Sequence, residues 1–62
     1  MDKEKRHLIQ EKVDELVKKY ELKTEAAKAA GDKISAFAYT TAAAAVLELS
    51  MEILILDATD KI

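Results

Sequence analysis

One stretch of this sequence limits the folds that the chain can adopt. Residues 36–56 read AFAYTTAAAAVLELSMEILIL, with no lysine or arginine and only two acids, Glu48 and Glu52. A helix that is apolar around nearly its whole circumference must be buried around nearly its whole circumference. The chain has only 62 residues, so the central question is what covers this segment.

Covalent or metal crosslinks offer no answer. The chain has no cysteine and a single histidine, His7, which excludes disulfides, thiolate sites and histidine-rich metal sites. A domain this small buries only about 60% of its unfolded surface when it folds alone. Self-association or a partner chain is therefore the expected source of further burial.

The composition narrows the class of protein. Half of the residues are hydrophobic and 35% are charged, with one glycine and no proline, which opposes both disorder and a turn-rich β-fold. The net charge of −2 is too small to indicate a polyanionic partner. The N-terminal run MDKEKRHLIQEK is too charged for a secretory signal peptide, so we predict a cytoplasmic protein.

The only strong turn signal is Gly31–Asp32. Glycine suits the left-handed position after a helix, and aspartate suits the N-cap of the next helix. The composition changes at the same point, because residues 1–33 carry 17 of the 22 charged side chains. We therefore predict one all-α domain over residues 1–62, an antiparallel helical hairpin with helices at about 2–30 and 33–58 joined by a turn at 31–32.

The first predicted helix is amphipathic. Its apolar stripe consists of Ile9, Val13, Leu16 and Tyr20 at helical spacing, with Leu8 and Val17 beside it. We interpret the charged residues of the opposite face as a solvated surface. A helix break near residues 21–24 is an alternative, because threonine at position 24 could cap a separate short helix.

The second predicted helix carries a coiled-coil-type seam with 3-4 spacing. Apolar residues also lie off this seam, among them Phe37 and Ile55 on its back. One amphipathic helix covers only a stripe about 100° wide, so the remainder requires another molecule. The predicted interface residues are Tyr39, Ala42, Val46, Leu49, Ile53, Leu56, Phe37 and Ile55.

Lipid and protein are the two candidate coverings. The segment from Ile34 to Leu56 is long enough to span a bilayer, but each of its two acids would cost about 2.5–3.5 kcal/mol at the centre of a membrane helix. Protein is the better prediction, and a second copy would complete a homodimeric four-helix bundle. A different protein on the same face is the alternative.

The residues that could carry chemistry are few. Glu48 and Glu52 project from one side of the second helix, and their counterparts in a dimer could bring four carboxylates together. Di-metal bundles also use Glu-x-x-His pairs, which neither glutamate forms, so we predict no metal or cofactor and treat both as possible contacts to a basic partner. No nucleophile is matched with a base, and the chain is predicted not to be an enzyme.

We therefore predict a non-enzymatic protein–protein interaction module, such as an adaptor, an inhibitor or a regulatory subunit, that acts as an oligomer. The alternative is an RNA-binding regulator that uses the charged face of the first helix. Phosphate binding favours an unopposed basic patch, whereas the basic residues of this helix are interleaved with acids. The residues to test for RNA binding are Lys5, Arg6, Lys12 and Lys19.

One local resemblance covers about a quarter of the chain. The run YTTAAAAVLELSMEIL, from Tyr39 to Leu54, resembles the later part of the small Hha/YmoA nucleoid-associated regulators. The matching residues are Tyr39, Glu48, Leu49, Met51 and Leu54. The charged Asp-His-Arg positions of that family fall on three alanines, at residues 43–45, so no functional residue is carried over.

Overall fold

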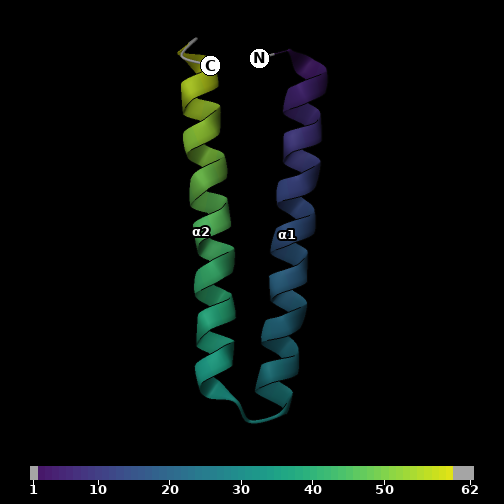
Figure 1. Ribbon diagram of the computed structural model, residues 1–62, viewed down its shortest axis with the longest axis vertical. Coiled ribbons are helices and arrows are strands. Elements are labelled where there is room, and N and C mark those ends of the chain that lie inside the picture. The colour runs from purple at the N-terminus through teal and green to yellow at the C-terminus, as the bar shows by residue number, and fades with distance from the viewer. Residues whose placement is uncertain (1, 60–62) are drawn as a thin grey trace.

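A computed structural model describes residues 2–59 of the chain. Helix α1 covers Lys3–Ala29 and helix α2 covers Lys33–Ala58. The two helices lie side by side and antiparallel, with the start of α1 and the end of α2 at the same end of the hairpin (Figure 1). The all-α hairpin prediction is confirmed; the predicted domain over 1–62 also includes positions 1 and 60–62, which lie outside the described residues.

The turn between the helices has the hydrogen bonds of a Schellman motif. The Gly31 N–H donates to the Lys28 carbonyl at 3.0 Å, and the Asp32 N–H donates to the Ala27 carbonyl at 2.8 Å. Gly31 has a φ of 75°, the left-handed conformation that this motif requires. The backbone groups at the end of α1 are thereby satisfied as the chain reverses.

Gly31→Ala should destabilise the hairpin by about 1 kcal/mol, because an L-residue with a Cβ is strained in the left-handed region. A Cβ at this position would meet no atom within 4 Å, so the loss comes from the backbone alone. Thermal unfolding followed by circular dichroism measures it. Gly31→Asn is the matched control, since asparagine tolerates this conformation; an equal loss in both variants would contradict the explanation.

Each helix begins at an aspartate N-cap. The Asp2 carboxylate accepts from the Lys5 N–H at 2.8 Å, and the Asp32 carboxylate accepts from the Ser35 N–H at 3.0 Å. Both acceptors satisfy a donor that the helix itself leaves unpaired. The sequence-based N-cap prediction for Asp32 is confirmed.

Asp32 should make part of the stability depend on pH. The Ser35 hydroxyl, and then the Ser35 backbone N–H, lower the pKa of Asp32 below its ordinary value. A carboxyl group with a lowered folded-state pKa stabilises the fold fully above its unfolded-state pKa, and the contribution is lost as the pH falls through the folded-state pKa. The thermal midpoint of the native chain should therefore approach that of Asp32→Asn as the pH is lowered through the acid range. The variant serves as the reference because asparagine caps a helix without titrating. Parallel curves for the two proteins would contradict this.

Helix α1 is continuous through the site of the alternative break. The Thr24 hydroxyl donates to the Tyr20 carbonyl one turn back at 2.8 Å, while Thr24 itself is only 8% exposed. Its hydroxyl is thus satisfied within the helix. Thr24 lies inside α1 rather than capping a second helix.

The face of α1 that meets α2 follows a 3-4 repeat. Val13, Thr24 and Ala27 are buried, and Ile9, Val17 and Tyr20 are half-buried. Leu16 belongs to the predicted stripe but is 41% exposed, and Leu8 is 54% exposed. Val17 thus lies in the hairpin contact, and Leu16 lies at its margin.

The opposing face of α2 consists largely of small or polar side chains. Tyr39 stacks on Tyr20, with ring centroids 6.3 Å apart and an interplanar angle of 27°. Near the turn, Ala36 of α2 and Ala27 of α1 are both buried, and the helices lie closest there and diverge toward the termini (Figure 1). The buried and half-buried positions of this face with 3-4 spacing are Ala36, Tyr39, Ala43, Val46, Ser50, Ile53 and Asp57.

The hairpin is a single layer of two helices. Its radius of gyration is 14.3 Å and its Cα extents are 45 × 17 × 9 Å, whereas a compact chain of this length has a radius of gyration of about 11 Å. It exposes 5014 Å², against about 4,000 Å² for a compact protein of this mass. The hairpin thus exposes about 1,000 Å² more surface than a compact protein of its mass. This excess is similar in size to the area of about 800 Å² that each partner buries in a standard protein–protein interface.

Candidate protein–protein interface

The structure places four of the eight predicted interface residues in or beside the hairpin contact and leaves the other four exposed. Tyr39, Val46 and Ile53 are half-buried on the face of α2 toward α1, and Ala42 is half-buried beside them. The other four are exposed to solvent, with exposed fractions of 75% for Phe37, 62% for Leu49, 55% for Ile55 and 41% for Leu56. The predicted seam thus combines the hairpin contact with a flank of α2 that α1 does not cover.

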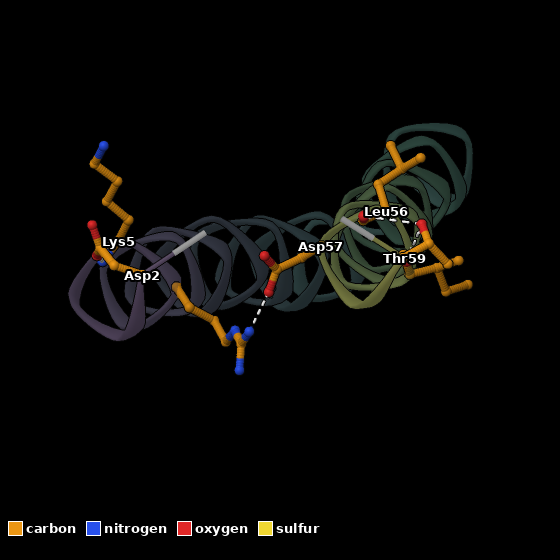
Figure 2. Close-up of polar contacts among 7 residues, drawn as sticks. Asp2, Lys5, Leu56, Asp57 and Thr59 are labelled. Carbon is orange, nitrogen blue, oxygen red and sulfur yellow. Dashed lines mark hydrogen bonds and ion pairs between the residues drawn. The ribbon is translucent and has the colours of Figure 1, made fainter. Parts of the chain in front are cut away.

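The division is visible at the end of the hairpin near the termini. Asp57 points from α2 toward α1, whereas its neighbour Leu56 points to the side (Figure 2). The Asp57 carboxylate accepts a hydrogen bond from the Arg6 guanidinium of α1, and the Asp57 side chain is only 3% exposed. This ion pair joins residues 51 positions apart and holds the two helices together where they diverge.

This ion pair was not predicted from the sequence. Asp57 continues the 3-4 series that faces α1, four residues after Ile53. This position could have indicated the ion pair from the sequence, because a carboxylate on a buried face requires a partner. Arg6 lies near the start of the antiparallel helix and is in range to supply it.

A second apolar seam runs along α2 beside the hairpin contact. Its residues are shifted by one position from the face that meets α1, which turns them about 100° around the helix. The exposed fractions are 75% for Phe37, 47% for Leu47, 62% for Met51 and 41% for Leu54. The second seam, with 3-4 spacing throughout, comprises Phe37, Thr40, Ala44, Leu47, Met51, Leu54 and Ala58.

The second seam can be buried without leaving its side-chain polar group unsatisfied. Thr40 carries its only hydroxyl, and that hydroxyl donates to the Ala36 carbonyl at 2.9 Å. The seam also borders shallow grooves between the helices. Thr40, Ala44 and Leu47 line the central groove opposite Glu21 and Glu25 of α1. Side chains of another helix could therefore enter this surface.

Glu48 and Glu52 are both exposed. Their helical positions place Glu48 on the side of α2 away from α1 and Glu52 one turn further along the same side. Within residues 2–59, histidine, aspartate and glutamate side chains form no group of three that could hold a metal ion.

Lysines of α1 lie beside the stacked tyrosines. The Lys23 ammonium is 5.5 Å from the centroid of the Tyr39 ring, and the Lys19 ammonium is 5.9 Å from that of Tyr20. These cation–π contacts occur on the side of the hairpin opposite the second seam. A third lysine, Lys12, pairs with Glu15 at 3.4 Å. These three lysines thus have contacts within α1 and α2.

The structure defines the class of the chain as an all-α helical hairpin. No family model matches the sequence, and neither the curated proteins nor the solved structures yield a match. Over the described residues, 2–59, neither helix combines the length and apolar character needed to cross a membrane.

Proposed function

We propose that this chain is a small non-enzymatic interaction module that acts as a homodimeric four-helix bundle. The observation that carries the proposal is the distribution of exposed apolar side chains. Eight large ones lie on α2: Ile34, Phe37, Leu47, Leu49, Met51, Leu54, Ile55 and Leu56. Contiguous apolar surface of this kind marks an interaction site.

The small apolar core of the hairpin also supports the proposal. Its buried apolar side chains are only Val13, Ala27 and Ala36 among the described residues. Fully burying one leucine, isoleucine or phenylalanine side chain contributes about 1.5–3 kcal/mol. A second copy that covers several of the exposed side chains of α2 would therefore add substantially to the apolar burial of the hairpin.

In such a dimer, the charged surface of α1 and the exposed Glu48 and Glu52 would remain available to a further partner. This arrangement suits an adaptor, an inhibitor or a regulatory subunit, which bind without catalysis. RNA binding through α1 is the alternative. The Lys12–Glu15 ion pair weakens that alternative, because it opposes a basic charge that phosphate would need.

Sedimentation equilibrium of the full chain at micromolar concentration tests the dimer. We expect the mass of two chains and a thermal midpoint that rises with protein concentration, because association stabilises the folded state by mass action. A stable, fully helical monomer would overturn the proposal. An electrophoretic shift with RNA at moderate salt, with Lys12→Glu and Lys19→Glu as variants, separates the alternative function.

A further inference from the structure

The second seam is the most continuous apolar surface that the hairpin leaves open. On the other flank of α2, the exposed large residues Leu49 and Leu56 alternate with alanines and Glu52. The second seam instead presents four large exposed side chains, at positions 37, 47, 51 and 54. Its one polar group is satisfied inside the helix. Covering the second seam would therefore bury more apolar surface than covering the other flank of α2.

The sizes of the side chains along the second seam determine how a second copy fits. Thr40 and Ala44 are small, and Leu47, Met51 and Leu54 are large. In a parallel pair, each seam residue would lie opposite the same residue of the second copy. The small residues would then pair with small ones, and the large residues with large ones. Packed helices lie about 8 to 10 Å apart depending on these side chains, so straight helices could not fill both kinds of layer.

An antiparallel pair reduces this mismatch in the middle of the seam. When Leu47 lies opposite Ala44 of the second copy, Met51 lies opposite Thr40, and Leu54 packs on Phe37. In the same register, Lys33 and Ala58, the first and last residues of α2, lie opposite each other. The two α2 helices therefore overlap along their full length, and the two-fold axis passes between positions 45 and 46.

The charges that border the grooves favour the same orientation. Glu21 and Glu25 line the central groove, whereas a depression near the termini, beside Leu54, is lined by Lys3, Arg6 and His7 together with one acid, Glu4. In the antiparallel dimer, the turn end of one hairpin lies beside the terminal end of the other, so Glu25 comes level with Arg6 and His7 of the second copy. In a parallel dimer, the two α1 helices would instead lie on opposite sides of the central α2 pair, so these acids would not meet the basic groups of the other copy.

We propose that two copies dock antiparallel through the second seam, with Leu47 on Ala44 and Met51 on Thr40 of the opposite chain. This inference rests on the proposed homodimer and adds its contact face and direction. The core of the bundle then consists of the hairpin contact in each copy and the second seams between the copies. Leu49 and Leu56 remain on the surface.

Disulfide trapping tests the arrangement, because the chain has no cysteine of its own. Thr40→Cys and Met51→Cys chains are mixed unfolded, refolded together and oxidised, and the products are identified by mass. We expect a disulfide between one Thr40→Cys chain and one Met51→Cys chain. Two Met51→Cys chains should not crosslink, because their cysteines would lie about 16 Å apart along the axis, beyond the Cα separation of about 7 Å that a disulfide allows.

The control pair lies on the other flank of α2. Ala42→Cys and Leu49→Cys would be opposite each other if that flank formed an antiparallel interface in the same register, so we expect no crosslink between them. Crosslinking of this pair in place of Thr40→Cys with Met51→Cys would overturn the contact face. Efficient crosslinking of Met51→Cys with itself would overturn the direction. Sedimentation of the native chain identifies the separate case in which no dimer exists and both proposals fail.

Discussion

Replacing Leu47 with glutamate is expected to dissociate the proposed dimer at micromolar concentration. Leu47 is 47% exposed in the hairpin and lies at the centre of the second seam. Each substituted chain loses about 2 kcal/mol of leucine burial and must also desolvate a carboxylate. Because both chains carry the change, the dimer loses about 4 kcal/mol or more, which corresponds to at least about 1,000-fold in Kd.

Sedimentation equilibrium measures this loss directly, and circular dichroism shows whether the released monomer stays helical. The matched control is Leu49→Glu, since Leu49 lies only two residues away and is 62% exposed on the opposite flank of α2. We expect Leu49→Glu to retain the dimer mass. Dissociation by Leu49→Glu together with a stable Leu47→Glu dimer would contradict the proposed contact face. Met51→Glu, also in the second seam, should reproduce the effect of Leu47→Glu.

Local chemistry made the ends of the two helices predictable. Gly31 and Asp32 each have a strong preference for one position in a turn, so two residues were sufficient to locate the reversal of the chain. The structure has Gly31 at a φ of 75°, with Asp32 as the N-cap of α2. Such preferences depend on a few neighbouring residues and not on distant contacts.

The face of α2 that packs against α1 was not predictable in the same way. Since residues 36–56 are apolar on almost every side, several 3-4 series satisfy the coiled-coil pattern equally well. The predicted series included Leu49 and Leu56, whereas the face that meets α1 carries Ser50 and Asp57 at the corresponding positions. Polar side chains on that face are tolerated because Ser50 bonds to the Leu47 carbonyl and Asp57 pairs with an arginine.

The close approach of the helices near the turn makes Ala36→Leu the second substitution with a large expected effect. Ala36 is 7% exposed and Ala27 is 8% exposed, and both lie where the helices are closest (Figure 1). A leucine at position 36 would add bulk where the two helices pack most closely, and the Schellman turn holds the two helix ends in place. Overpacking of this kind costs about 1–3 kcal/mol.

Thermal unfolding at matched protein concentration should therefore show a lower midpoint for Ala36→Leu, by about 4–8 °C for each kcal/mol lost. Ala38→Leu adds the same atoms two residues away at an exposed position, and it should leave the midpoint unchanged or raise it slightly. An unchanged midpoint for Ala36→Leu would mean that the turn can open without loss of stability. The hairpin contact would then depend on the residues nearer the termini, including the Arg6–Asp57 ion pair, rather than on the buried alanines.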